Sequence, residues 1–303
     1  MKPMKAMILA AGLGTRLLPL TANRPKPLVP VGNRPIIDRT ICWLKTHGAD
    51  DIIVNAHYHL DQMRHHLDQG RPFGLKIHIS EEPEILGTGG GIQKTKWFWG
   101  RDPFIVVNGD ILTDIDLSAA YRAHLKNGNL VTLVLHDSAP FNQIRINRQK
   151  DILDINPVPQ PGRLAFTGIH IISPEVLENI PAGRPSCILA SYRLLIRDGR
   201  PIRGHVVKNP YWRDAGTIES YIQANREALN GAPFLVGRNA RVHDDAQLNG
   251  WAVLGDNIIV ERGAGITRSI VWENVTIKEG VQIVDSIVAT PGEVAADRVG
   301  VIE

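Results

Sequence analysis

The segment Leu9-Ala-Ala-Gly-Leu-Gly-Thr-Arg16 ends an apolar run that begins at Met4, and it decides the fold of the N-terminal part of the chain. An apolar run that stops at a pair of glycines predicts a buried strand followed by a turn. Because glycine has no Cβ, backbone N–H groups in this turn can face a phosphate chain, which Arg16 and Lys26 can neutralise. The Walker Gly-Lys-Ser/Thr is absent, and Leu17 stands where a dinucleotide-binding motif has its third glycine. A purely structural turn is the alternative for the glycine pair by itself.

Further apolar runs bounded by turn residues follow, and helical patterns such as Ile36–His47 and Leu60–Gln69 lie between them. Strands that are apolar throughout and separated by helices are typical of a parallel sheet covered on both faces. The expected fold class is therefore α/β, with a doubly wound mixed sheet whose ligands bind beyond the carboxyl ends of the strands. The strand-like runs are MKAMILAAG, DDIIVNAH, LKIHIS, FIVVNGD and LVTLVLH.

Near Phe141 the pattern changes to shorter strands, QIRIN, DILDI and FTGIHIIS, which we expect to be partly antiparallel and to form a lid over a second substrate pocket. Helical patterns then cover Pro174–Ile180, Ser186–Asp198 and Thr217–Leu229, and the last ends near Asn230-Gly231.

From Val236 onward, apolar residues recur every six positions in two registers. This period is typical of hexapeptide β-helix repeats, in which each repeat supplies one face of a triangular coil. An irregular β-rich tail is the alternative. The two registers are Val236, Val242, Leu248, Leu254, Val260 and Ile266, and Ala240, Ala246, Ala252, Ile258, Ala264 and Ile270.

The composition excludes several classes of protein. Of 303 residues, 43% are hydrophobic and 21% charged, and the net charge of +3 has no run of like charges, so a nucleic-acid partner is not expected. Cys42 and Cys187 lie far apart without metal-ligand spacing, so neither a disulfide framework nor a zinc site is expected. The basic N-terminus MKPMKAMILAAGLGTR has too short an apolar run for a signal peptide, and no stretch could span a bilayer. We expect a cytoplasmic protein with no membrane partner.

The stretch from Gly12 to Val31, called the signature segment here, reads GxGTRxxPxTxxxPKPxxPV and resembles the signature of the sugar-1-phosphate nucleotidyltransferases. These enzymes join a nucleoside triphosphate to a sugar 1-phosphate and release pyrophosphate. The resemblance implies a Rossmann-like catalytic domain, here residues 1–230, and a left-handed β-helix, here residues 234–303. We expect the β-helix to stabilise the catalytic domain or to join subunits into a homo-oligomer. The resemblance also implies that Arg16 and Lys26 are catalytic, and that the nucleotide is bound by Leu9, Ala10, Ala11, Gly12, Gly14, Thr15, Glu82, Gly87, Thr88, Gly89, Asn108 and Asp110.

Two carboxylates are candidates for a Mg²⁺ site. Asp110 follows the apolar run of FIVVNGD, and Asp214 in YWRDAGT precedes a glycine and a new helix. A hard cation takes one or two protein carboxylates together with phosphate oxygens, although an Asp after a strand is more commonly a helix cap or turn residue. The second segment is similar to the family's W-x-D-x-G-T, so the resemblance implies that Asp110, also catalytic, and Asp214 together bind Mg²⁺.

The segment EEPEILGTGGG, residues 81–91, resembles the family's loop over the nucleobase. Glu82 stands where many uridylyl and thymidylyl enzymes have a glutamine. A carboxylate only accepts hydrogen bonds, and guanine offers two adjacent donors whereas uracil has one N–H between two acceptors. This favours GTP. The residues E-E-P...L-G-T-G also resemble those of the guanylyltransferases for mannose and heptose phosphates. The triple glycine followed by Ile92 instead resembles N-acetylmuramate-1-phosphate uridylyltransferases, so UTP is the alternative.

The sugar side departs from the family pattern. Phe141-Asn142 replaces a Tyr/Phe-Gly pair, and Ile155-Asn156-Pro157 replaces the Glu-Lys-Pro whose lysine pairs with the sugar phosphate. The match of FTGIH implies that Thr167 and Gly168, with Asn142, meet the sugar. Two other classes of function stay open, a hexapeptide acyltransferase using His243 and a non-catalytic sugar-nucleotide sensor.

Overall fold

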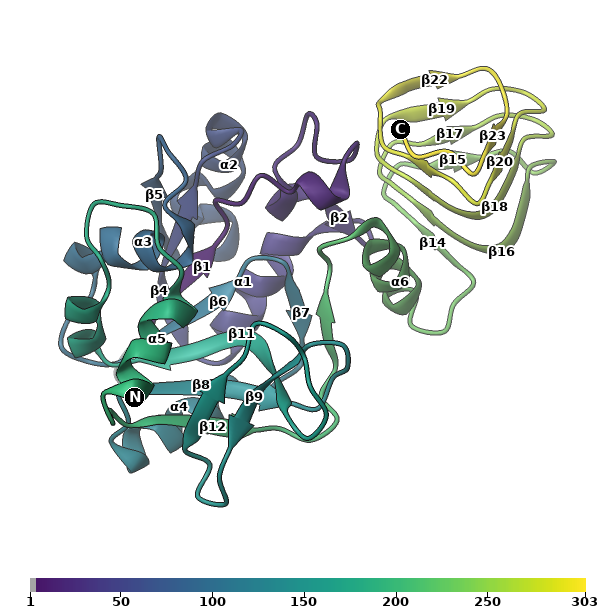
Figure 1. The fold of residues 1–303 in the computed structure, drawn as a ribbon. Helices are drawn as coiled ribbons and strands as arrows, with labels where there is room; N and C mark the ends of the chain where they lie inside the picture. The colour runs from purple at the N-terminus through teal and green to yellow at the C-terminus, as the bar shows by residue number, and fades with distance from the viewer. Residues whose placement is uncertain (1–3) are drawn as a thin grey trace. The chain divides into compact units, whose positions relative to one another are not determined.

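The computed structural model describes residues 4–303 (Figure 1). The first three residues of the basic N-terminus, part of the segment considered as a signal peptide, lie outside the described residues. The chain divides into two compact units, unit 1 formed by the chain through Leu13 with Ile37–Arg213, and unit 2 formed by Gly14–Ile36 with Asp214–Glu303. The signature segment therefore passes from one unit to the other after Leu13.

Unit 1 is built on a mixed sheet with β1 (Met4–Leu9) in its interior. This strand pairs in parallel with β4 (Ala49–Ala56) and β6 (Phe104–Asn108), and β4 pairs in parallel with β5 (Lys76–Glu81). Most residues of β1, β4 and β6 are buried, as strands covered on both faces should be. The predicted α/β class with helices between strands is confirmed. The helices of unit 1 are α1 (Ile36–Thr46), α2 (Leu60–Leu67), α3 (Gly87–Lys94), α4 (Leu117–Asn127) and α5 (Ile188–Arg197).

The strands expected to form a lid instead continue the same sheet, so that expectation is wrong. The long strand β11 (Leu164–Ile172) is antiparallel to β6, β8 and β9. Most of its residues are buried, and both of its edges pair with other strands of the sheet. The predicted helix at Pro174–Ile180 is a 3-10 helix, Pro174–Asn179. The remaining strands of unit 1 are β7 (Ile111–Thr113), β8 (Val131–His136), β9 (Asn142–Ile146), β10 (Ile152–Ile155), β12 (Ile202–Val206) and β13 (Trp212–Asp214), which ends at the border of unit 2.

Unit 2 combines most of the signature segment, the helix α6 (Ile218–Ala228) and two parallel sheets of short strands near the C-terminus. Phe234 pairs with Ala252 and Gln247 with Gly265, so residues three hexapeptides apart lie side by side. Figure 1 shows these strands as successive passes of the chain, from green to yellow. One sheet contains β14 (Phe234–Val236), β16 (Gln247–Leu254), β18 (Gly265–Val271), β20 (Gln282–Val284), β21 (Ile287–Val288) and β23 (Arg298–Val299); the other contains β15 (Arg241–Val242), β17 (Ile259–Val260), β19 (Val275–Ile277) and β22 (Gly292–Val294); β2 (Pro30–Val31) and β3 (Arg34–Pro35) form a hairpin in the signature region.

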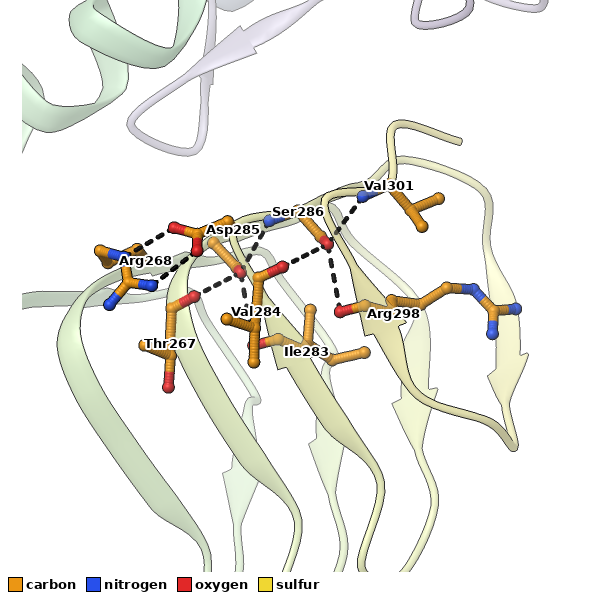
Figure 2. Close-up of polar contacts among 9 residues, drawn as sticks. Thr267, Arg268, Ile283, Val284, Asp285, Ser286, Arg298 and Val301 are labelled. Atoms are coloured by element: carbon orange, nitrogen blue, oxygen red, sulfur yellow. Dashed lines mark hydrogen bonds and ion pairs between the residues drawn. The ribbon is translucent and has the colours of Figure 1, made fainter.

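Polar side chains join neighbouring passes of these strands at their turns. Asn257 accepts from the Asn239 amide at 3.1 Å and donates to Asn274 at 3.0 Å, and all three have positive φ, which asparagine tolerates. In Figure 2 the Arg268 guanidinium makes two bonds of 2.6 Å to Asp285. Between the sheets, buried Val, Ile and Leu side chains form the core.

No helix within residues 4–303 is both long and apolar enough to cross a membrane.

Two buried histidines make the stability of unit 1 depend on pH. His124 lies 3.0 Å from the Thr132 hydroxyl and 3.2 Å from that of Ser173, and burial lowers its pKa from 6.5 to about 4. His170 lies 2.6 Å from the Tyr192 hydroxyl, and burial lowers its pKa to about 3. As the pH falls below 6.5, the unfolded chain therefore takes up protons that the folded chain does not, and the folded state loses stability.

We expect the free energy of unfolding to fall by roughly 1–2 kcal/mol for each of these histidines between about pH 7 and pH 5. His124→Gln keeps a hydrogen-bonding side chain but cannot titrate. Its free energy of unfolding should therefore fall less than that of wild type between about pH 7 and pH 5. Denaturant unfolding at the two pH values measures the difference, and the exposed His65→Gln is the control. An equal loss in wild type and His124→Gln would contradict this account.

Candidate active site

A buried chain of hydrogen bonds ties together the carboxyl ends of β1, β4 and β5. The Asn55 Oδ1 accepts from the N–H of Ala10 at 2.7 Å, and the Asn55 amide donates to Glu82 Oε1 at 2.7 Å. Glu82 Oε2 accepts from the N–H of Leu86 at 2.9 Å. Asn55 and Glu82 are 3% and 2% exposed. The start of the glycine turn is thereby held in place relative to the EEPEIL segment.

The sequence predictions omitted Asn55 from the site. Its signal was a polar residue near the end of the otherwise apolar run DDIIVNAH. In the structure, each carboxylate oxygen of Glu82 accepts one hydrogen bond within the protein. Glu82 therefore stabilises the local fold, besides its predicted contact with the base. A carboxylate oxygen has a further lone pair, and the base-reading role of Glu82 stays a prediction.

The glycines of GTGGG begin helix α3 and do not form the expected loop. A Cβ at Gly87 would lie 2.7 Å from the Ser186 carbonyl oxygen, and one at Gly89 would lie 2.6 Å from the Ser186 hydroxyl. The N–H of Gly89 donates to the Ser186 carbonyl at 2.9 Å, and the Thr88 hydroxyl accepts from the N–H of Ile188 at 3.0 Å. Close packing against residues 186–188 is therefore a sufficient reason for these glycines, whatever binds nearby.

A cavity of about 420 Å³ opens beside the start of α3. Its wall includes Pro83, Glu84 and Leu86 from the EEPEIL segment, and Lys94 and Arg184 add positive charge. Its volume lies within the range of small-molecule sites in proteins.

At the end of β6, the segment NGD packs against β1. The N–H of Gly109 donates to the Leu9 carbonyl at 2.8 Å, and a Cβ at Gly109 would lie 2.7 Å from that oxygen. A Cβ at Gly168 would lie 2.8 Å from the Asn108 amide nitrogen, and Gly168 has a φ of +79°. Close packing therefore requires glycine at both positions, and the half-buried Asp110 follows directly after Gly109 in the chain.

In unit 2, residues of the signature segment that follow Gly14 fold back and pack against it. This glycine has a φ of +68°, and a Cβ there would lie 3.0 Å from side-chain carbons of both Lys26 and Thr21. The buried Thr21 hydroxyl donates to the Gly14 carbonyl at 2.9 Å. By contrast, no described atom lies within 4 Å of a Cβ placed at Gly12, so internal packing does not demand glycine at that position.

Two predicted site residues far apart in the sequence approach one point in unit 2. A Cβ at Gly216 would lie 2.4 Å from Asp214 Oδ1 and 2.8 Å from Arg16 Nη2. Gly216 directly precedes α6, where Thr217 and Ser220 form a reciprocal capping box. The glycine thus leaves space that a carboxylate and a guanidinium share.

The side chains of Thr167 and Asn142, two residues predicted to contact the sugar, already make hydrogen bonds within the protein. The Thr167 side chain is fully buried, and its hydroxyl donates to the Val134 carbonyl at 2.9 Å. The Asn142 amide donates to Asp137 at 2.7 Å, and its oxygen accepts from the N–H of Ser138 at 2.9 Å. Their contacts with a sugar stay predictions, and the backbone N–H and C=O groups at these positions are the candidates for such contacts.

An aromatic cluster that the sequence analysis did not assign lies beside these residues. Trp212 donates its indole N–H to the Thr167 carbonyl at 2.8 Å. Its ring centroid lies 4.8 Å from that of His136 and 5.4 Å from that of Phe141, which is 41% exposed. Within residues 4–303, the buried His136 Nε2 has no hydrogen-bond partner. The cluster therefore offers an exposed ring and an unsatisfied polar atom.

No group of three or more His, Cys, Asp or Glu side chains within residues 4–303 is placed to hold a metal ion. A Mg²⁺ ion bound mainly through substrate phosphates needs only one or two carboxylates. Asp110 and Asp214 supply the hard oxygen donors that this ion prefers, so the residue types fit.

Comparison with known proteins gives a consistent result. A profile of the family described as nucleotidyl transferase matches residues 5–231. The chain is 36% identical over 233 residues to N-acetylmuramate alpha-1-phosphate uridylyltransferase of Neisseria meningitidis serogroup B, covering 76% of this chain and 99% of that protein. It is 30% identical over 290 residues to mannose-1-phosphate guanylyltransferase of Mycobacterium tuberculosis, covering 92% of this chain and 80% of that protein.

The fold is also found among solved structures. The crystal structure of HddC from Yersinia pseudotuberculosis matches with a TM-score of 0.64 at 25% identity, covering 74% of this chain and 99% of that chain. The predicted Rossmann-like fold of the N-terminal part is thus confirmed.

We expect Gly216→Ala to reduce nucleotidyl transfer about 10- to 100-fold, because the added methyl must displace Asp214 or Arg16 and small displacements of catalytic groups are costly. The control is Gly100→Ala, since no described atom lies within 4 Å of a Cβ at Gly100. Initial rates and thermal unfolding of both variants are measured. A Gly216→Ala protein with wild-type rates would show that the shared space is not part of the site.

Proposed function

The chain belongs to the nucleotidyl transferase family as a sugar-1-phosphate nucleotidyltransferase, and we propose that it converts GTP and a sugar 1-phosphate into a GDP-sugar and pyrophosphate. The observation that supports nucleotidyl transfer best is the family match over residues 5–231, which contains the signature segment. The acyltransferase and sensor hypotheses lack any comparable support.

The proposed reaction is an in-line attack by a phosphate oxygen of the sugar 1-phosphate on the α-phosphorus of the nucleotide. The bond between the α-phosphorus and the bridging oxygen breaks, and pyrophosphate leaves. A phosphate dianion needs no general base, so the protein contributes positioning and charge neutralisation. We assign Arg16 to the departing pyrophosphate and Lys26 to the charge that develops at the α-phosphoryl group.

We propose that Asp110 and Asp214 bind Mg²⁺, which when bound would neutralise phosphate charge. The backbone of residues 9–15, with Gly87, Thr88, Gly89 and Asn108, is assigned to the nucleotide. In unit 1 the hydrogen bond from Ala10 to Asn55 supports this assignment, because it holds the first residues of the turn.

The choice of GTP rests on Glu82, a group that only accepts hydrogen bonds in its charged form. The likeness to the guanylyltransferase, which extends over 92% of this chain, agrees with it. UTP is the second candidate, favoured by the 36% identity to the uridylyltransferase and by the internal hydrogen bonds that already use both oxygens of Glu82.

For the sugar we propose that the ring stacks on the exposed face of Phe141 and that the His136–Phe141–Trp212 cluster lines its site. Aromatic faces suit the apolar side of a pyranose, and Phe141 presents the exposed ring of this cluster. The backbone at Asn142, Thr167 and Gly168 is assigned to the same site.

We propose that residues 234–303 form a left-handed β-helix that follows a catalytic domain over residues 1–230. The parallel pairing of residues three hexapeptides apart supports the β-helix. Association of two or more chains through this part is a proposal that mass measurement in solution would test.

We expect Asp110→Asn and Asp214→Asn each to abolish Mg²⁺-dependent pyrophosphate release while the protein stays folded. Asparagine keeps the shape of the side chain but lacks the charge that a hard cation requires. Rates are measured over a Mg²⁺ titration, with Asp244→Asn, an exposed residue, as the control. A near-wild-type rate at limiting Mg²⁺ would remove that aspartate from the metal site.

A matrix of nucleoside triphosphates against sugar 1-phosphates tests the function and the base together. If Glu82 reads guanine, wild type should prefer GTP over UTP by about tenfold or more, and Glu82→Gln should narrow that ratio. If Glu82 acts only through Asn55 and Leu86, Glu82→Gln should lower the rates with both nucleotides and leave the ratio unchanged. A wild-type preference for UTP would overturn the proposal of GTP.

A further inference from the structure

The signature segment is anchored to the C-terminal strands inside unit 2. Arg24, between the predicted catalytic residues Arg16 and Lys26 in sequence, forms an ion pair with Glu273. The Arg24 guanidinium also lies 4.4 Å from the centroid of the Trp272 ring, a cation–π distance. Both partners of the ion pair are partly buried, with side-chain exposures of 24% and 30%, so water screens the pair less than one on the open surface.

A second anchor passes through Tyr221 on α6. The indole N–H of Trp272 donates to the Tyr221 hydroxyl at 2.9 Å, and that hydroxyl donates to the Pro30 carbonyl at 2.9 Å. Tyr221 is fully buried and Trp272 is 4% exposed. Burial raises the pKa of Tyr221, so the hydroxyl keeps the proton that it donates to the signature segment.

A third anchor lies just beyond the signature segment. The Asn33 amide donates to the Leu254 carbonyl in β16 at 2.6 Å. The N–H of Gly32 donates to Asn225 at 2.9 Å, and Asn225 is fully buried on α6, where it donates to the Tyr221 carbonyl at 3.0 Å. The segment is therefore held at several points along its length by α6 and the C-terminal strands.

The two positions that receive these contacts, Leu254 at the end of β16 and Trp272 just after β18, belong to adjacent passes of the chain. The N–H of Gly255 donates to the Val271 carbonyl at 2.8 Å, next to Leu254 on one pass and Trp272 on the other. A Cβ at Gly255 would lie 2.5 Å from the backbone nitrogen of Glu273, so the passes approach as closely as only glycine allows. The anchors therefore rest on a single closely packed surface.

Contacts within the signature segment connect the anchored residue Arg24 to the catalytic candidates Lys26 and Arg16. Arg24 is two residues from Lys26, and the side chains of Lys26 and Thr21 both pack against Gly14, which lies two residues before Arg16. Loosening the segment at Arg24 should therefore alter the positions of Lys26 and Arg16.

We propose that Arg24, Tyr221, Trp272 and Glu273 are positioning residues for nucleotidyl transfer, holding the signature segment in the shape that presents Arg16 and Lys26 to the phosphates. This inference rests on the proposed function of those two side chains. It gives the C-terminal strands a part in catalysis beyond the stability of the fold. None of the four residues is assigned a contact with substrate.

The test uses the full chain with Glu273→Gln, which removes the charge that pairs with Arg24, and Trp272→Phe, which keeps a ring but lacks the indole N–H. The matched control is Asp285→Asn, which breaks the ion pair with Arg268 on the same strands (Figure 2). We expect kcat to fall roughly tenfold in the two anchor variants, with little change in the KM for the sugar 1-phosphate, and to stay near wild type in the control.

Hydrogen exchange of backbone amides in residues 14–31 provides a second measurement that does not require activity. We expect faster exchange there in Glu273→Gln and Trp272→Phe, while thermal unfolding and exchange in the core of unit 1 stay unchanged. If wild type releases no pyrophosphate with any substrate pair, the proposed function fails, and this exchange still decides whether the anchors order the segment.

The proposal is overturned if Glu273→Gln and Trp272→Phe match Asp285→Asn in both kcat and exchange of residues 14–31. It is also overturned if the rate lost in the anchor variants is only the rate expected from a lower fraction of folded protein, as measured by unfolding under the assay conditions. A double variant with Arg24→Met supports it further if the effects of Arg24→Met and Glu273→Gln on kcat are not additive.

Discussion

The parallel register of β1 between β4 and β6 is the constraint on which the rest of unit 1 depends. Leu9 pairs with Asn55 on one side and Asn108 on the other, so two polar residues end beside the start of the glycine turn. Parallel strands bring their carboxyl ends to one edge of a sheet, and the buried backbone groups beyond that edge need partners. The Asn55 side-chain oxygen accepts from the N–H of Ala10, and the Asn55 amide donates to Glu82.

Glycine has two separate uses in this protein. At Gly14, Gly168 and Gly87 a positive φ coincides with a close approach by another part of the chain, so the fold itself requires glycine. At Gly12 no such neighbour lies among the described residues, and at Gly216 the space is shared by Arg16 and Asp214. Gly12 is therefore the position at which the proposed nucleotide gives the better reason for the absent side chain.

The C-terminal strands show how a repetitive structure can serve a specific site. The asparagine ladder repeats from pass to pass, and the ion pair of Arg268 with Asp285 joins two passes, so both stabilise the stack. Trp272 and Glu273 have a different use, because their side chains contact Arg24 and Tyr221. Trp272 and Glu273 directly follow β18, so the contact to the signature segment is made at a turn between two passes.

The sequence by itself determined the α/β class and the six-residue period, because both follow from local patterns of apolar and turn residues. The candidates Arg16, Lys26, Asp110 and Asp214 came from the resemblance of short motifs to those of a known family. The sequence could not place β11 inside the main sheet, because strand pairing depends on contacts between residues distant in the chain. Only the tertiary structure decided that the Asn55 amide and the Leu86 N–H each donate to one carboxylate oxygen of Glu82. It also decided that Arg16 and Asp214 both approach Gly216, and that Trp272 contacts the signature segment through Tyr221. Each of these contacts joins segments that are distant in the sequence, and neither segment's local pattern indicates its partner. Because a buried polar group without a hydrogen bond costs free energy, burial in the folded protein favours these contacts.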